Sequence, residues 1–379
     1  MIDQHTHTML RDKPPAIDGQ RDGDRAMHGS NLIHDTAPLE TMFALSVALG
    51  RDDYAHAANR YLHRFATHCI ETVSGLFPWG EHAYWHLVED RVGNGYVDSA
   101  GRTHPPIHDH LRQAPLWLWR RLDAINPDCV QRFAHGLDNH WTEGEPREYI
   151  RHAIIDARRH HPRGARSCDF PRHGGFYIFD WAFAYTRSED PALAEQMRAM
   201  LDYWWRKKHP SGLLGIESRC PADDETDFAR SLGVGQTLSL ASSLLQAADL
   251  LNGILPELVT DMRERAAVYI DGFFSAPHDP AAGRFLILTS VDGKPLKKPE
   301  HMAIWGSRYG QWPASYVGLN ALCTYRSGRG DSRLLDWAAA VGRSYLTEPM
   351  PEGVAFPAMD AGLTVELLDD LYEINDDTA

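Results

Sequence analysis

Helical periodicity repeats along almost the whole chain and constrains its fold more than any other feature. Strand-like alternation is scarce, and Gly283–Val291 is the best candidate for a strand, with a short hairpin beside it. The pattern predicts an all-α protein with a minor β-hairpin. Asp35 or Thr36 is the expected N-cap of the first helix. Apolar residues recur at spacings of three and four in Leu39–Leu49, Tyr54–Ile70, Leu116–Ile125, Val130–Trp141, Phe176–Tyr185, Leu193–Trp205, Leu232–Leu251, Leu258–Phe274, Tyr316–Tyr325, Leu334–Leu346 and Leu363–Ile374.

Glycine-containing turns follow alternate helical segments. They lie at Gly75, Gly212, Gly283 and Gly353. The last three are spaced by about 70 residues, as expected for one helical hairpin plus its loops, and the first interval is close to twice that length. Repeated hairpins bury their apolar faces on their neighbours, and a ring of about six to seven of them forms an (α/α) toroid. We therefore predict an (α/α)-toroid fold.

Composition and patterning set the expected organisation. The chain has 379 residues, 43% of them hydrophobic, which is enough for a sizeable core. We expect a polar N-terminal segment over residues 1–27 and a single (α/α)-toroid catalytic domain over residues 28–379. No apolar run approaches the roughly 20 residues of a membrane helix, so no membrane span is expected. The protein is expected to be periplasmic or secreted if a leader was removed and cytoplasmic otherwise, and to be a monomer or small homo-oligomer.

Charge and cysteine usage exclude several functions. A net charge of −14 opposes nucleic-acid binding. The five cysteines are far apart and form no CxxC pair, so neither a disulfide framework nor a structural zinc site is expected. We expect no metal and no cofactor. A basic island between Arg147 and His173 stands out in this acidic chain and favours a locally held anionic ligand, although a solvated basic surface would give the same pattern.

The segments near the glycine turns combine aromatic residues with His, Arg or Glu. Trp79 and Trp305 lie outside the periodic helices beside glycine and charged residues. Aromatic rings pack on the apolar faces of sugars, while guanidinium groups bind carboxylates. The expected partner is therefore an anionic polysaccharide or oligosaccharide.

Two reactions suit such a substrate. Hydrolysis needs paired carboxylates, and Glu81, Asp180 and Glu217 are available. β-Elimination needs a base at the uronate C5 proton, an acid at the departing O4, and donors at the carboxylate. His173 and Tyr309 match the base and the acid.

Several short motifs together resemble the alginate and glucuronan lyases of polysaccharide lyase family thirty-eight. The matching strings are Gly75–Tyr84, which holds Trp79-Gly80-Glu81-His82, then His110–Pro115, Asn139-His140-Trp141 and Arg172-His173-Gly174. The resemblance implies a toroid fold and His/Tyr acid–base chemistry, with Asn and Arg at the carboxylate. Pro171 stands where the family has Asn, so Asn139 or Arg219 would take that role. Tyr309 and Tyr316 both remain candidates for the acid.

We accordingly expect a lyase that cleaves a uronic-acid polysaccharide of the glucuronan or alginate type by β-elimination. The expected catalytic residues are His173, Tyr309, Arg308 and Asn139. The expected substrate-binding residues are Trp79, His82, Arg172, Arg219, Trp305, Tyr316 and His140. The alternatives are a glycoside hydrolase or sugar epimerase on the same fold that uses Glu81, Asp180 or Glu217, and a non-catalytic carbohydrate-binding scaffold.

Overall fold

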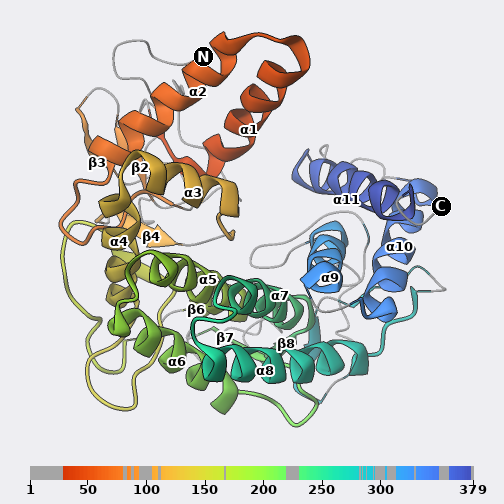
Figure 1. Cartoon of the computed structure of the whole chain (residues 1–379). Helices are drawn as coiled ribbons and strands as arrows, with labels where there is room; N and C mark the ends of the chain where they lie inside the picture. The colour runs from red at the N-terminus through yellow and green to blue at the C-terminus, as the bar shows by residue number, and fades with distance from the viewer. Residues whose placement is uncertain are drawn as a thin grey trace, which may run out of the picture. The chain divides into compact units, whose positions relative to one another are not determined.

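The computed structural model contains eleven α-helices within the residues that it describes (Figure 1). The described residues are 29–79, 83–86, 89–93, 105–109, 112–165, 168–218, 230–280, 283, 285–286, 288–292, 294, 304, 313–327, 330–349 and 358–376. The helices are α1 (Leu32–Leu49), α2 (Asp52–Arg64), α3 (Leu116–Ile125), α4 (Pro127–Gly136), α5 (Pro171–Ser188), α6 (Pro191–Arg206), α7 (Val234–Leu250), α8 (Pro256–Ser275), α9 (Ala314–Ser327), α10 (Ser332–Thr347) and α11 (Ala358–Asp376). Each periodic segment coincides with one helix, which confirms the helical prediction.

The first helix begins earlier than predicted. Asn31, rather than Asp35 or Thr36, is its N-cap, because the Asn31 side chain accepts a hydrogen bond from the Ile33 amide at 3.1 Å. The Asn31 amide group also donates to the Ala83 carbonyl at 2.7 Å, so the cap is held from both sides. The expected N-cap position was therefore wrong by about one turn.

The chain divides into two compact units. Unit 1 comprises Met1–Ser167 and Phe183–Gln196, and unit 2 comprises Cys168–Ala182 and Met197–Ala379. The divisions fall within α5 and α6, so each of these helices contributes residues to both units. The single domain over residues 28–379 stays a prediction.

Unit 1 contains the helical hairpins α1/α2 and α3/α4. A π-helical turn, Phe65–Cys69, extends α2, and a 3₁₀ turn, Leu137–His140, extends α4. The strands form two antiparallel sheets, β1-β2-β3 and β4-β5. Their bounds are β1 (Gly29–Ser30), β2 (Tyr84–His86), β3 (Arg91–Gly93), β4 (Ile107–Asp109) and β5 (His152–Ile154). The core beneath the hairpins is aromatic, with the rings of Phe77 and Phe133 stacked at 4.3 Å.

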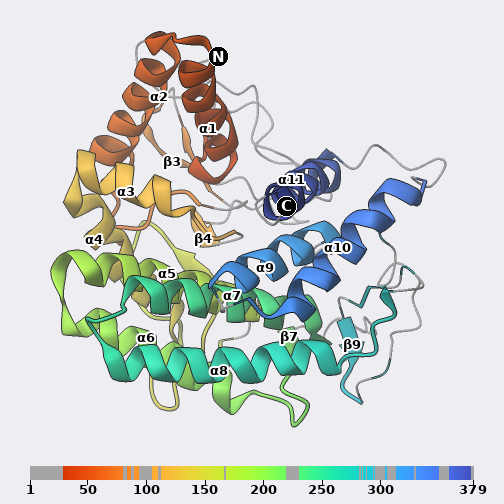
Figure 2. The same cartoon turned by 45° about the vertical axis from the view of Figure 1, so that its right-hand side comes forward.

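Unit 2 contains α7 to α11 and an antiparallel sheet in the order β6-β7-β8-β9. The strands are β6 (Cys168–Asp169), β7 (Gly215–Ser218), β8 (Arg230–Gly233) and β9 (Leu288–Ser290). The prediction of strand structure near Gly283–Val291 is confirmed by β9, although the sheet has four strands rather than two. Helix α8 runs alongside α7, and α10 runs alongside α9 (Figure 2). Strands β6 and β8 lead directly into α5 and α7.

The glycine turns have one structure in both units. Gly75 and Gly212 have φ values of +88° and +87°, which favour glycine. The side chains of Ser74 and Ser211 accept hydrogen bonds from the amide two residues later, at 3.0 and 3.4 Å. A Cβ atom on Gly75 would lie 2.4 Å from the Arg132 carbonyl oxygen. The corresponding atom on Gly212 would lie 2.8 Å from the Val268 carbonyl oxygen. Gly75 and Gly212 therefore share a turn pressed against a helix backbone. A Cβ atom on Gly283 would meet only the Ser344 and Glu348 side chains, at 3.5 and 4.0 Å, and Gly353 lies outside the described residues.

A second device recurs at the ends of helices. A tyrosine on the second helix of a hairpin donates its hydroxyl proton to a buried aspartate at or just before the start of another helix. The three pairs are Tyr61 with Asp35 (2.5 Å), Tyr203 with Asp169, and Tyr345 with Asp360 (2.7 Å). These bonds tie the first turns of α1 and α11, and the strand before α5, to a neighbouring helix.

Candidate active site

The first turn of α5 carries the most distinctive polar group in unit 2. Helix α5 begins at Pro171, a residue that suits the first helical position. The His173 imidazole is fully buried, with its centre 5.4 Å from the Phe170 ring and 6.0 Å from the Phe176 ring. The buried Arg172 guanidinium lies 4.8 Å from the centre of the Phe170 ring. A titratable ring and a cation are thus held side by side in an aromatic environment.

Two glycines explain how this turn is packed. A Cβ atom on Gly174 would lie 2.1 Å from the Trp204 indole nitrogen of α6. On Gly175 it would lie 2.8 Å from the Ser243 side chain of α7. The Gly174-Gly175 pair therefore lets two helices approach the start of α5, which gives this part of the Arg-His-Gly motif a packing role.

One face of α5 continues the polar character. His173, Phe176 and Asp180 are spaced by three, four and seven residues and share that face. Asp180 is also buried. Its role as the alternative carboxylate stays a prediction.

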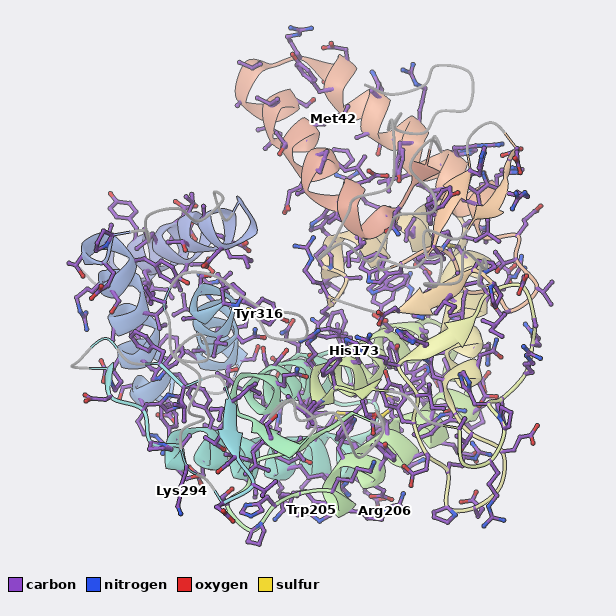
Figure 3. The ribbon with its side chains drawn as sticks, turned by 180° about the vertical axis from the view of Figure 1, so that it is seen from behind. Met42, His173, Trp205, Arg206, Lys294 and Tyr316 are labelled. Carbon is purple, nitrogen blue, oxygen red and sulfur yellow. The ribbon has the colours of Figure 1, made fainter. Side chains whose placement is uncertain are left out.

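Helix α7 contributes polar groups that the sequence analysis missed. Gln236, Ser239 and Ser243 are buried and recur at helical spacing. The Ser239 and Tyr316 hydroxyl oxygens are 3.3 Å apart, which links α7 to the first turn of α9. In the view of Figure 3, Tyr316 and His173 lie above Trp205, Arg206 and Lys294. The sequence feature that could have identified these residues was the serine-rich, otherwise apolar run Ser239–Gln246.

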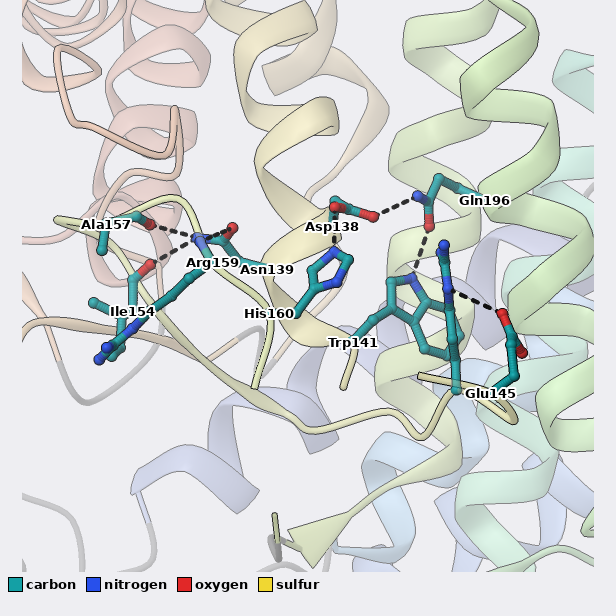
Figure 4. Close-up of polar contacts among 10 residues, drawn as sticks. Asp138, Asn139, Trp141, Glu145, Ile154, Ala157, Arg159, His160 and Gln196 are labelled. Carbon is teal, nitrogen blue, oxygen red and sulfur yellow. Dashed lines mark hydrogen bonds and ion pairs between the residues drawn. The ribbon is translucent and has the colours of Figure 1, made fainter. Parts of the chain in front are cut away.

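Asn139 belongs to a different network, in unit 1 (Figure 4). Its amide nitrogen donates to the carbonyls of Ile154 and Ala157 at 3.0 and 2.7 Å. Its carbonyl oxygen accepts the Arg159 amide at 3.2 Å. The Asn139 side chain thus holds the loop after β5, and its predicted role at a substrate carboxylate stays a prediction.

His140 lies beside it and is fully buried. Its Nδ1 is 2.7 Å from the Ile150 carbonyl oxygen, and its Nε2 is 2.8 Å from Nδ1 of His108. His140 therefore donates through Nδ1, and His108 donates to its Nε2. Burial lowers the pKa of His140 to about 3. The ring is neutral at ordinary pH, and its predicted contact with substrate stays a prediction.

Carboxylates match the basic island within unit 1. Glu145 lies 3.6 Å from Arg147, Asp109 lies 3.9 Å from the buried Arg151, and Asp138 lies 2.6 Å from His160. Asp138 also accepts from the Gln196 amide, which in turn accepts from the Trp141 indole (Figure 4). Carboxylates of unit 1 thus lie beside part of the basic island, including Arg147 and Arg151.

The remaining predicted residues fall into two groups. Trp79 is buried in unit 1, where its indole nitrogen donates to the Arg112 carbonyl at 3.1 Å. The residues outside the described part of the chain are Glu81, His82, Arg219, Trp305, Arg308 and Tyr309. Glu217 lies on β7, but its side chain is outside the described set. Their roles stay predictions.

Within the described ranges, His, Cys, Asp and Glu side chains form no group of three that could hold a metal ion. None of the helices in those ranges combines the length and apolar character that a bilayer crossing requires. Among the described residues, His173 and Tyr316 carry groups that can transfer a proton, and Arg172 carries a positive charge.

Comparison with solved structures defines the fold class. The chain is similar to a cellobiose 2-epimerase from Spirochaeta thermophila, with a TM-score of 0.52 and 13% identity over 100% of this chain and 92% of that one. It is also similar to a sugar epimerase from a ruminal bacterium, with a TM-score of 0.54 and 10% identity over 93% and 83% of the two chains. A D-mannose isomerase gives 0.51 and 10% over 86% and 77%. The predicted (α/α)-toroid fold is confirmed.

Other comparisons are weaker. A family GH76 α-mannanase from Bacteroides thetaiotaomicron gives a TM-score of 0.44, and this chain spans 63% of its length. A polysaccharide lyase gives 0.37 over 55% of this chain, a likeness too low to support the predicted lyase family. No protein-family model matches the sequence, and no curated protein matches it. The fold is thus that of toroid carbohydrate-active enzymes, without assignment to one family.

Proposed function

We propose that this protein epimerises or isomerises a reducing sugar by moving a proton at the carbon beside its carbonyl group. One observation carries the proposal: His173 is a buried imidazole between two aromatic rings at the start of α5. The support from fold is that the three toroid structures with TM-scores above 0.5 described above are titled as sugar epimerases or an isomerase. A sugar epimerase was the alternative prediction from the sequence, although there with Glu81, Asp180 or Glu217 rather than His173 as the acting residue.

The reaction needs only proton transfer. Neutral His173 would remove the proton from C2 of the open-chain sugar, and the electron pair would move onto the carbonyl oxygen to give an enediolate. The Arg172 guanidinium would stabilise that negative charge. Return of a proton to the opposite face of C2 restores the C1 carbonyl and gives the epimer. Transfer of the O2 proton to O1, followed by protonation of C1, gives the ketose with its carbonyl at C2. The Tyr316 hydroxyl is our candidate for the second proton carrier.

Proton exchange tests the proposal directly. The protein is incubated in D₂O with mannose, glucose and cellobiose, and the sugars are followed by proton NMR. We expect loss of the C2 proton signal and the appearance of an epimer or ketose. His173→Gln should reduce that rate by about 10³-fold while the protein stays folded, as for loss of a general base. Unchanged turnover in folded His173→Gln, or no exchange with any reducing sugar, would overturn the proposal.

β-Elimination is the second candidate, and Arg172 favours it. A buried guanidinium next to the base is suited to the carboxylate of a uronate. The same His173 would then remove the C5 proton. Ultraviolet absorbance of an unsaturated product from glucuronan, polymannuronate or polyguluronate would select this reaction, because epimerisation creates no C4–C5 double bond.

A further inference from the structure

A buried cluster joins the end of α6 to the strand before α5. The Asp169 carboxylate accepts the Tyr203 hydroxyl proton, and the Lys207 ammonium lies 3.1 Å from the same carboxylate oxygen. The ammonium is also 2.6 Å from the Tyr203 hydroxyl and 4.3 Å from the centre of its ring. Tyr203 and Lys207 are four residues apart, so both project from one side of the helix end.

Burial makes this cluster sensitive to the loss of either partner. The Asp169 side chain is 1% exposed and the Lys207 side chain 18% exposed. A desolvated carboxylate is costly unless cations and donors compensate it, so removing the ammonium would displace the carboxylate rather than leave it in place. This differs from an exposed ion pair, whose loss changes little.

The cluster and the neighbouring Trp204 contact the chain on both sides of His173. Asp169 ends β6, two residues before α5 begins, and the His173 amide donates to the Phe170 carbonyl at 3.0 Å. On the other side, Trp204 presses on Gly174. The α6 segment from Tyr203 to Lys207 therefore fixes the backbone both before and after His173.

We propose that Tyr203 and Lys207 are positioning residues for His173, acting through Asp169 to set the angle at which the imidazole meets the substrate. This rests on the proposed function, in which His173 transfers the proton. A displacement of about 1 Å at a reacting group lowers a rate by about 100-fold. Loss of the ammonium is therefore expected to lower kcat far more than it changes KM.

The kinetic test uses Lys207→Met, Lys207→Arg and Tyr203→Phe. We expect Lys207→Met and Tyr203→Phe to lower kcat by about 100-fold with KM little changed, and Lys207→Arg to restore most of it, because Arg keeps the charge. Tyr61→Phe is the matched control, since it removes a buried Tyr–Asp bond at the start of α1. Equal losses in Tyr61→Phe and Tyr203→Phe would overturn the proposal.

A readout that needs no activity separates this proposal from the proposed function. The ring ¹⁵N and ¹H signals of His173 are assigned by their loss in His173→Gln. We expect these signals to shift in Lys207→Met and Tyr203→Phe, to stay in place in Tyr61→Phe, and to return toward the wild-type position in Lys207→Arg. An unmoved His173 signal in folded Lys207→Met overturns positioning, whatever reaction the enzyme performs. A shifted signal in a protein that acts on no sugar would leave the positioning standing and remove the proposed function.

Discussion

The two units share their construction but differ in what their polar side chains contact. Both use a Ser-Gly-Leu turn against a helix backbone and a Tyr–Asp bond at a helix start. In unit 1, the Asn139 side chain bonds to backbone groups of β5 and the following loop, and His140 bonds to the Ile150 carbonyl and the His108 ring. In unit 2, the hydroxyl of Ser239 reaches another side chain, Tyr316, on a neighbouring helix. The shared contacts therefore stabilise the fold. From the difference we predict which substitutions lower activity and which lower stability.

Breaking the shared turn should give the largest effect in both units. Gly75→Ala and Gly212→Ala each place a Cβ atom against a carbonyl oxygen and keep a left-handed backbone. We expect each to lower the free energy of unfolding by about 3 kcal/mol, from roughly 1–2 for the backbone and the rest for the clash. Urea unfolding followed by circular dichroism measures this loss.

Matched controls isolate the clash from the backbone term. Gly164 in unit 1 and Gly253 in unit 2 have φ values of +78° and +82°, but an added Cβ atom would have no neighbour within 4 Å. Their alanine variants should therefore lose only about 1–2 kcal/mol. If the controls lose as much as Gly75→Ala and Gly212→Ala, close packing against the helix is not what the repeated turn requires.

Acid should weaken both units through buried histidines. Burial lowers the pKa of His140 in unit 1 to about 3 and that of His278 in unit 2 to about 4, from an ordinary value of 6.5. Below pH 6.5 the unfolded chain binds protons that these folded rings do not bind. The free energy of unfolding should then fall by about 1.4 kcal/mol per pH unit for each histidine, down to about pH 4 for His278 and about pH 3 for His140. Neither ring contributes to the pH dependence above pH 7.

Replacement of His278 tests the predicted direction of this pH dependence. His278→Asn should be less stable than the wild type at pH 7, because the Leu286 amide loses its acceptor, Nδ1 of His278. The wild type should lose more stability than the variant between pH 6.5 and pH 4.5, so the two unfolding curves should approach each other as the pH falls. If the two proteins lose the same stability over that range, the prediction that His278 is a buried neutral ring is wrong.

The helices were predictable because each buries an apolar stripe with its own period. Every expected helix was found, and the glycines at Gly75 and Gly212 were visible in the sequence because neither position has room for a side chain. The predicted start of α1 was wrong because the Asn31 cap is also held by Ala83, 52 residues away. The residues of the helix alone do not reveal that contact. The sheet β6-β7-β8-β9 was underestimated because its strands have only two to four residues each, too short for a visible alternation.

The candidate site was predictable only where a motif and a helix start coincide. Arg172 and His173 were found in this way, since their string precedes a strong helical period. The polar residues of α7 were missed because serine in an apolar helix also occurs without function. Asn139 and His140 were proposed for substrate contact from a short motif, but their partners Ile154, at the end of β5, and Ile150 lie later in the chain, outside the motif. Long-range partners therefore limit what local sequence can assign.

Truncations of one polar side chain in each unit give the smallest and most discriminating effect. Asn139→Ser removes an amide that makes three hydrogen bonds to the loop backbone, and we expect a loss of about 2 kcal/mol in unfolding free energy with kcat little changed. Tyr316→Phe removes one long hydroxyl contact to Ser239, and we expect a loss of at most about 1 kcal/mol. If Tyr316 carries the second proton, the same change should lower kcat by about 100-fold.

Both variants are measured for their free energy of unfolding and for their rate of C2 proton exchange, which separates a loss of stability from a loss of activity. A stable Asn139→Ser that loses kcat would return Asn139 to the carboxylate-binding role that the sequence predicts. A Tyr316→Phe with full exchange would move the proton-donor assignment to Tyr309, for which Tyr309→Phe is the corresponding variant. The Asn139 side chain makes three hydrogen bonds to backbone groups, whereas the Tyr316 hydroxyl lies 3.3 Å from the Ser239 hydroxyl. We therefore expect the greater stability loss for Asn139→Ser and the greater rate loss for Tyr316→Phe. The reverse order would mean that the polar contacts of unit 1, rather than those of unit 2, serve the reaction.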